Sequence, residues 1–258
     1  MSSSTRSVLV TDRGGDGTPR ASGPEIPRNG PVEAAGSAAG PDDVYLPQAD
    51  TLLLMEALGD LPVRGSRVLD LCTGTGVVAV EAAARGAHVT AIDSAPAAVR
   101  AARAVSTGAG VDVDVHLADV AEFSSTLAFD VITCNPPYVP TPVGAENLRG
   151  AAEGPTEAWN AGPDGRAVLD VVCGRFDELL SPTGTALIVQ SAFAGSDRTL
   201  AVLRKSGFVA DVVRRRAIPF GPVLLARRDL LRRVGAIPPG CRVEEIVVVR
   251  AHRPVGAS

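Results

Sequence analysis

The chain has 258 residues, 45% of them hydrophobic, and a formal net charge of −4 at pH 7. This length suits one substantial α/β domain, and the negative charge argues against a globally basic protein built to bind nucleic acid. The four cysteines form no CxxC pair and have no histidine at ligand spacing, so we expect neither a metal site nor a disulfide framework. Because no apolar run approaches a membrane span and no signal peptide is evident, the sequence predicts a cytoplasmic protein.

The N-terminal part differs in composition from the rest of the chain. Residues 1–40 are rich in Ser, Gly, Pro and Ala without apolar periodicity, which predicts a disordered tail. We expect one folded domain over residues 41–258, opened by a helix that Asp50 or Thr51 caps. Residues 141–164 form a long connection rich in Gly, Glu and Pro, which we interpret as a substrate loop.

After the first helix, short apolar strands alternate with helices. The predicted strands cover residues 67–71, 88–93, 113–119, 129–134, 184–193, 208–218 and 242–253. The predicted helices cover residues 76–86, 95–108, 165–182 and 197–207. This alternation predicts an α/β fold with a doubly wound, mostly parallel, seven-stranded sheet. Because the last two strands have no clear crossover helix between them, we expect the final strand to be antiparallel.

A glycine turn follows the first strand. In "LDLCTGTGVVA", Gly74 and Gly76 let the backbone turn tightly and approach a ligand closely. Together with Ala79 they also fit the loose dinucleotide pattern GxGxxA, so the loop alone does not identify its ligand. Asp70 at the strand end favours an ammonium group over a pyrophosphate, which its carboxylate would repel. S-adenosylmethionine carries such an ammonium group and no phosphate.

Acidic residues also end the next two strands. Asp93 stands where a ribose-binding carboxylate belongs, and Asp119 is placed to accept a hydrogen bond from an adenine amine. Each acid alone is more often a cap or a solvated strand end than a ligand residue. Because the carboxyl ends of parallel strands meet at one sheet edge, three acids around one glycine turn predict an S-adenosylmethionine site rather than a nicotinamide site.

The fourth strand ends in "CNPPYV", and we predict that its polar end is catalytic, through Asn135, Pro136, Pro137 and Tyr138. The Asn135 side-chain oxygen and the Pro136 carbonyl are suited to accept the two N–H groups of a planar NH₂. These oxygens would also stabilise the positive charge that develops on the nitrogen during in-line methyl transfer. The prolines fix the backbone, and Tyr138 offers a flat face. The target group is then a glutamine amide or the amine of adenine or cytosine.

These motifs resemble a known family. "LDLCTGTG", "AID", "LAD" and "NPPYV" resemble class I S-adenosylmethionine-dependent methyltransferases, which have a Rossmann-like fold. "VYLPQADTLLLMEAL" and "NAGPDGRAVLD" are similar to segments of the HemK/PrmC-type release-factor glutamine methyltransferases, and the resemblance covers about residues 43–253. It implies that Asn135 and Pro136 contact a substrate amide. The predicted cofactor-binding residues are Tyr45, Thr51, Asp70, Cys72, Thr73, Gly74, Gly76, Asp93, Ser94, Asp119, Val120 and Asn135.

The chain departs from this family's pattern at three points. Cys72 stands where members often have Gly, and Ala161 replaces the first Gly of their Gly-Gly-x-Asp-Gly segment. Bacterial members also carry a helical N-terminal domain that docks the release factor, whereas this chain has only the tail. It therefore resembles the shorter branch of the family, which often works with a small partner subunit.

Our first hypothesis is an enzyme, an S-adenosylmethionine-dependent methyltransferase that acts on a glutamine of a translation release factor or similar protein. The alternatives are an amino-methyltransferase for DNA or RNA, a small-molecule amide or amine methyltransferase, and a non-catalytic cofactor-binding scaffold. The arginine-rich segment 214–233 is either a solvated face or a docking surface for an acidic or RNA-associated partner. Trp159 either anchors the substrate loop or forms one wall of the substrate cleft.

Overall fold

The computed structural model describes residues 9–10, 44–152 and 154–254. The predicted tail at residues 1–40 lies outside the described residues, apart from β1 (Leu9–Val10), which pairs in parallel with β5 (Ser124–Ser125). Within the described part of the chain, no helix is both long and apolar enough to cross a membrane.

The remaining seven strands form one sheet in the order β4-β3-β2-β6-β7-β9-β8. Their bounds are Arg67–Leu71 for β2, His88–Asp93 for β3, Val113–Leu117 for β4, Phe129–Cys134 for β6, Leu180–Ser191 for β7, Val209–Pro219 for β8 and Val243–His252 for β9. β9 runs antiparallel to both of its neighbours, and all other neighbouring pairs are parallel. The predicted fold is confirmed, and its antiparallel last strand lies inside the sheet.

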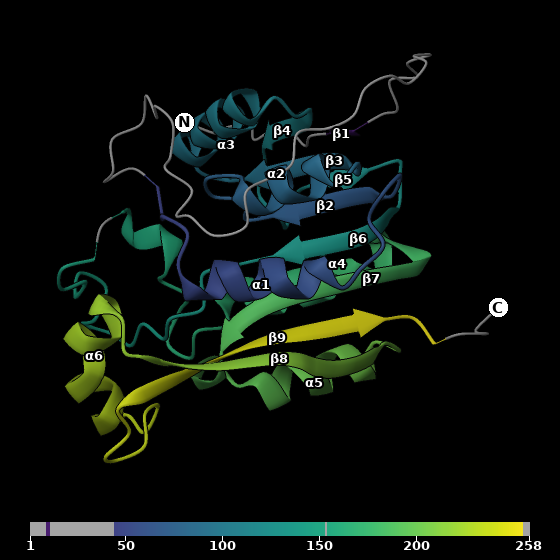
Figure 1. Ribbon diagram of the computed structural model, residues 1–258. Coiled ribbons are helices and arrows are strands. Elements are labelled where there is room, and N and C mark those ends of the chain that lie inside the picture. Colours follow the sequence, from purple (N-terminus) through teal and green to yellow (C-terminus); the bar gives the residue numbers. More distant parts are fainter. Residues whose placement is uncertain (1–8, 11–43, 153, 255–258) are drawn as a thin grey trace, which may run out of the picture.

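Among the described residues, six α-helices accompany the sheet. They are α1 (Ala49–Gly59), α2 (Val77–Ala84), α3 (Pro96–Ala109), α4 (Ala167–Leu179), α5 (Ser196–Lys205) and α6 (Pro222–Arg233), with short 3₁₀ turns at Thr156–Ala158 and Ala192–Ala194. In Figure 1, α1 lies in front of the sheet, and α6 lies at the end of the molecule toward which β6 points. That end is also where the parallel strands finish.

Helix α6 is absent from the prediction. It begins with Pro222 in its first turn, a position that proline favours. Its buried residues Val223, Leu224, Arg227 and Leu231 recur at helical spacing. Arg227 lies in the middle of this buried face and is 0% exposed, as buried as a core leucine. Because a charged residue interrupts the apolar pattern, the sequence did not indicate this helix.

Helix α1 begins at Ala49, and its N-cap lies two residues before Asp50, the nearer of the two predicted caps. Gln48 is the N-cap residue and makes no side-chain capping bond, so the capping role expected of Asp50 or Thr51 is wrong. Asp50 instead lies inside the first turn and is 3% exposed. Leu53 and Leu54 of this helix pack into the core. Asp50 lies three and four residues before them, on the same face of the helix, so its carboxylate also points inward.

The strand directions gather the functional segments at one edge of the sheet. The glycine turn follows β2, Asp93 ends β3, and Asn135 follows β6, so all three lie at the carboxyl ends of parallel strands. Because β9 is antiparallel, it is the beginning of this strand that reaches the same edge (Figure 1). Residues far apart in sequence, including Glu244, therefore meet there.

Candidate functional site

Two cavities open at this edge. The larger has a volume of about 690 Å³ and is lined by the glycine turn, the loops after β3, β4 and β6, and the segment that leads into α1. It brings together Pro137 and the predicted cofactor-binding residues Tyr45, Thr51, Asp70, Cys72, Thr73, Gly74, Asp93, Ser94, Asp119, Val120 and Asn135. Gly76 is not among the described residues that line it.

Asp70 is the most buried acid of the larger cavity, at 2% exposed. The hydroxyl groups of Thr73 and Thr133 each donate a hydrogen bond to its carboxylate at 2.6 Å. Burial, opposed by these hydrogen bonds, raises the pKa of Asp70 to about 6. An ammonium group beside this carboxylate would stabilise its charged form, so the site fits the amino-acid end of S-adenosylmethionine.

The glycine turn is fastened to the next strand by Asp93. Its two carboxylate oxygens accept hydrogen bonds from the backbone N–H groups of Gly74 and Ala95, both at 2.9 Å. Burial raises the pKa of this carboxyl. Cys72 has a φ of 55°, a left-handed conformation that favours glycine, which gives a physical reason for the glycine often found there in the family it resembles.

Two predicted cofactor residues play a local structural part. Gly76 is the N-cap of α2 with a φ of 82°, and a Cβ atom added to it would lie 2.8 Å from the Cβ of Ala102. It therefore permits close packing of α2 against α3. The exposed carboxylate of Asp119 accepts a hydrogen bond from the Ala121 N–H at 2.8 Å and borders the cavity. Its contact with an adenine stays a prediction.

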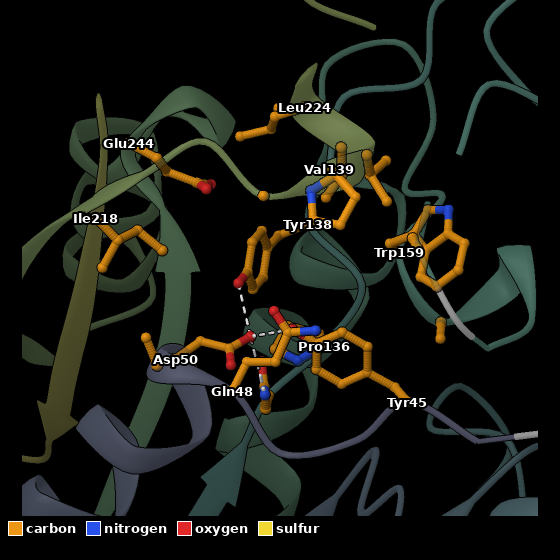
Figure 2. Close-up of a pocket in the computed structure, with 17 residues that line it drawn as sticks. Tyr45, Gln48, Asp50, Pro136, Tyr138, Val139, Trp159, Ile218, Leu224 and Glu244 are labelled. Carbon is orange, nitrogen blue, oxygen red and sulfur yellow. Dashed lines mark hydrogen bonds between the residues drawn. The ribbon is translucent and has the colours of Figure 1, made fainter. Parts of the chain in front are cut away.

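The smaller cavity has a volume of about 100 Å³ (Figure 2). Its polar and aromatic lining residues are Tyr45, Gln48, Asp50, Asn135, Tyr138, Trp159 and Glu244, and Pro136 also lines it. Asn135 lines both cavities, so its amide lies where they meet. Trp159 is 3% exposed, which makes it both a buried anchor of its loop and a wall of this cavity.

The carboxylate of Asp50 orients the residues around it (Figure 2). One oxygen accepts hydrogen bonds from the Tyr138 hydroxyl at 2.7 Å, the Tyr45 hydroxyl at 3.2 Å and the Asn135 Nδ2 atom at 3.3 Å. The other accepts from the Thr51 N–H at 2.7 Å, while the Thr51 hydroxyl oxygen accepts a second bond from Asn135 Nδ2 at 3.2 Å. Since a carboxylate only accepts, the nitrogen of Asn135 must face Asp50, and its oxygen is left for a ligand.

The smaller cavity is aromatic and acidic. Asp50 and Glu244 contribute two carboxyl groups, and no Lys, Arg or His is present among the described residues that line it. Burial and the Asp50 charge raise the pKa of Tyr138 well above its usual value, so its hydroxyl stays protonated and donates. Such a cavity suits a group that presents N–H donors and disfavours an anion.

Arg227 of α6 holds the loop at residues 141–164 in place, and Ala152, Ala158 and Trp159 of this loop line the smaller cavity. Its guanidinium donates to the Leu148 carbonyl at 2.8 Å, to the Thr141 hydroxyl at 2.9 Å and to the side-chain oxygen of Asn160. Burial lowers the pKa of this guanidinium, and the charge of Glu146 opposes the shift. The loop and α6 are therefore one unit, although the sequence did not suggest that they meet.

Replacing Arg227 by Met should loosen this unit without touching the larger cavity. We expect Arg227→Met to lower the free energy of unfolding by about 2 kcal/mol, because buried carbonyl and amide acceptors lose their donor. The KM for the substrate should rise about 10-fold while the affinity for cofactor is retained. Thermal unfolding, calorimetry and steady-state kinetics would check this. Arg233→Met, at an exposed position of the same helix, is the matched control.

The arginines of β8 are largely engaged within the fold. Their ion-pair partners are Asp60 for Arg214, Glu245 for Arg215 at 2.8 Å and Glu56 for Arg216 at 2.9 Å. These pairs are solvent-exposed and contribute little stability individually. They favour the interpretation of this part of segment 214–233 as a solvated, charge-balanced face.

Comparison with known proteins gives the family. Residues 48–147 match the family described as the methyltransferase small domain. A relative from Methanocaldococcus jannaschii, provisionally named a protein N5-glutamine methyltransferase, is 31% identical over 184 residues, which cover 71% of this chain and 90% of the relative. The release factor glutamine methyltransferase of Mycolicibacterium smegmatis is 33% identical over 197 residues, covering 73% of this chain and 68% of that protein.

Solved structures share the fold. A chain of the E. cuniculi Mtq2–Trm112 complex, which methylates the translation termination factor eRF1, superposes with a TM-score of 0.53 at 22% identity, covering 82% of this chain and 99% of that one. The ribosomal protein L11 methylase of Lactobacillus delbrueckii reaches the same TM-score at 15% identity, with 83% of each chain covered. Sequence and fold thus agree, and this chain belongs to the HemK/PrmC-type family of class I S-adenosylmethionine-dependent methyltransferases.

Proposed function

We propose that this protein methylates the side-chain amide nitrogen of a glutamine in a translation release factor or a similar protein. The observation that carries the proposal is the position of Asn135 between the two cavities, with its nitrogen held by Asp50 and Thr51. This orientation presents the Asn135 oxygen to an N–H donor. The names of the two relatives support glutamine as the target.

The larger cavity is the proposed cofactor site. S-adenosylmethionine, when bound, supplies an electrophilic methyl group on a sulfonium. Asp70 would hold its ammonium group, while Asp93 and Asp119 line the part of the cavity suited to the ribose and adenine. Ser94 and Val120 follow these two acids directly, which supports their assignment to the same end of the cofactor.

The chain's own oxygens prepare the substrate nitrogen. An amide nitrogen is a poor nucleophile because its lone pair is delocalised into the carbonyl group. In the proposal, Asn135 Oδ1 and the Pro136 carbonyl accept its two N–H groups and rotate the lone pair toward the larger cavity. They also stabilise the positive charge that develops as the new N–C bond forms and the bond from the methyl group to sulfur breaks. The methylated nitrogen then loses one proton to water, which restores the neutral amide.

The acidic smaller cavity supports a protein substrate over a nucleic acid. Its two carboxyl groups, without a cation among the described lining residues, disfavour a polyanionic strand. The β8 arginines, which would be the basic patch, already pair with carboxylates. A charge-neutral glutamine side chain enters such a cavity without this penalty.

The direct test uses labelled cofactor. The purified protein is incubated with methyl-labelled S-adenosylmethionine and a bacterial peptide-chain release factor, and the methylated residue is mapped by mass spectrometry. We expect one labelled glutamine amide. Transfer to adenine or cytosine in an RNA or DNA control, or label on no glutamine at all, would contradict the proposal.

Cofactor affinity should depend on pH through Asp70. Its pKa is raised to about 6, so its carboxylate is increasingly protonated as the pH falls below that value. An ammonium group binds the charged form, so we expect affinity for S-adenosylmethionine to fall about 10-fold between about pH 7 and about pH 5. Isothermal titration calorimetry would measure it, and an equal affinity at both pH values would argue against the ammonium–Asp70 contact.

A small partner subunit is also part of the proposal. The Mtq2–Trm112 complex shares its fold with this chain and pairs a methyltransferase with a second protein. Affinity purification from native lysate, followed by a methylation assay of the isolated complex, tests for such a subunit. A partner that raises transfer to the release factor would support this part of the proposal.

A further inference from the structure

Glu244 is a buried acid in the smaller cavity that sequence reasoning did not single out. It is the second residue of β9, pairs in register with Ile218 of β8, and is only 5% exposed. Side chains alternate along a strand, so its neighbour Glu245 faces the other side, where it pairs with Arg215 at 2.8 Å. Figure 2 shows the Glu244 side chain extending from the β9 wall toward Tyr138.

The two carboxyl groups of the cavity differ in how far their hydrogen-bonding capacity is used. Asp50 accepts from the hydroxyls of Tyr45 and Tyr138, from the Asn135 amide and from the Thr51 backbone, so both of its oxygens are occupied. Glu244 has the Ser191 hydroxyl as a partner. A carboxylate offers about four acceptor positions, so Glu244 keeps capacity for a ligand that Asp50 does not.

No Lys, Arg or His is among the described residues that line the cavity beside Glu244, and Arg216 of the neighbouring strand β8 pairs with Glu56. The groups that face it are Asp50 on α1, Tyr45 before that helix and Tyr138 after β6, while the adjoining residues of β8 and α6, Ile218 and Leu224, are apolar. Burial and the charge of Asp50 raise the pKa of Glu244 to about 7, against the Ser191 hydrogen bond. A ligand that donates a hydrogen bond would stabilise its carboxylate.

We propose that Glu244 is a substrate-binding residue that accepts a hydrogen bond from a backbone N–H next to the target glutamine. The inference rests on the proposed function, in which Asn135 and Pro136 already accept both N–H groups of the amide. Another N–H of the entering peptide is then the donor left for Glu244. Its carboxylate also repels an acidic side chain at the flanking position, which makes Glu244 a specificity determinant.

Three variants test this assignment. Glu244→Gln keeps the shape and removes the charge, Glu244→Ala removes the side chain, and Glu245→Gln is the control on the outward face of the same strand. Each protein is assayed with a bacterial release factor and with glutamine-centred synthetic peptides that carry Ala or Asp beside the glutamine. Cofactor affinity and thermal unfolding are measured in parallel, to separate substrate binding from folding.

We expect Glu244→Ala to raise the KM for the Ala-flanked peptide about 10-fold, the loss of one charge-assisted hydrogen bond, while cofactor affinity is retained. Wild-type KM should fall as the pH rises from about 6 to about 8, because Glu244 ionises in this range, and Glu244→Gln should remove this dependence. In both Glu244 variants, the ratio of kcat/KM for the Asp-flanked peptide to kcat/KM for the Ala-flanked peptide should be higher than in the wild type. The Glu245→Gln control should behave as wild type.

The outcome separates this inference from the proposed function. If the wild type methylates the glutamine but the Glu244 variants keep its KM, pH profile and peptide preference, the role of Glu244 is wrong and the proposed function stands. If the wild type labels no glutamine in the release factor or in any peptide, the proposed function fails, and this inference fails with it.

Discussion

Asn135→Ala should reduce kcat for methyl transfer about 10²- to 10³-fold, the usual loss when one preplaced group that stabilises transition-state charge is removed. Asn135 is half-buried where the two cavities meet, and its oxygen is the acceptor left free by Asp50 and Thr51. Without this oxygen, one N–H group of the substrate amide has no acceptor, and the nitrogen lone pair returns to conjugation with the amide carbonyl. Single-turnover assays with labelled cofactor measure this step directly.

Cofactor binding should survive the Asn135→Ala substitution within about 3-fold, since Asp70 and Asp93 remain in the larger cavity. Asn147→Ala, at an exposed position in the substrate loop, is the matched control and should keep wild-type kcat. A near wild-type rate for Asn135→Ala would refute the proposed role of the amide. Loss of both binding and activity would instead indicate a folding defect, which thermal unfolding would reveal.

Asp50→Asn should reduce kcat about 10- to 100-fold, although the substitution is nearly isosteric. An amide offers one accepting oxygen and one donating NH₂, whereas the Asp50 carboxylate accepts from Tyr45, Tyr138, Asn135 and Thr51. At least one donor would then face another donor, at a cost of about 1–3 kcal/mol. Rotating the Asn135 amide relieves the conflict but turns its nitrogen toward the substrate.

The control for Asp50→Asn lies at the other end of the same helix. Asp60 is the C-cap residue of α1 and forms an exposed ion pair with Arg214, so Asp60→Asn should leave kcat unchanged. An Asp50→Asn enzyme with wild-type kcat would mean that this network does not orient Asn135. The substrate KM is a useful second readout, because Tyr138 of the same network lines the cavity.

That most of the predicted cofactor-binding residues line one cavity could be predicted from the sequence, because its parts are local. Asp70 lies near the end of β2, Asp93 ends β3 and Asn135 follows β6, and the parallel topology brings these strand ends together without further information. Gly76 is the exception, since the pattern that marked it as a ligand residue also serves helix packing. A glycine in such a turn can serve either the approach of a ligand or the packing of two helices. Only the position of Ala102 in the structure shows that Gly76 serves helix packing.

The lining of the smaller cavity could not be predicted, because it depends on contacts between distant segments. Glu244 is one of two adjacent acids, and only the strand register decides which faces inward. Arg227 reads as a surface charge until Leu148 and Thr141 are placed against it. Asp50 was expected as a helix cap, and a shift of two residues in the N-cap position decides whether its carboxylate faces the backbone or the cavity.

The position of β9 bears on how the enzyme matures during synthesis. Every described residue of the larger cavity lies between Val44 and Val171, whereas the smaller cavity also needs Ile218, Leu224 and Glu244. Since β9 inserts between β7 and β8, β8 joins the sheet only after the last strand has left the ribosome. Because a domain folds as a unit, the smaller cavity cannot be completed until β9 has been synthesised, whereas the described residues of the larger cavity are all in the chain long before then.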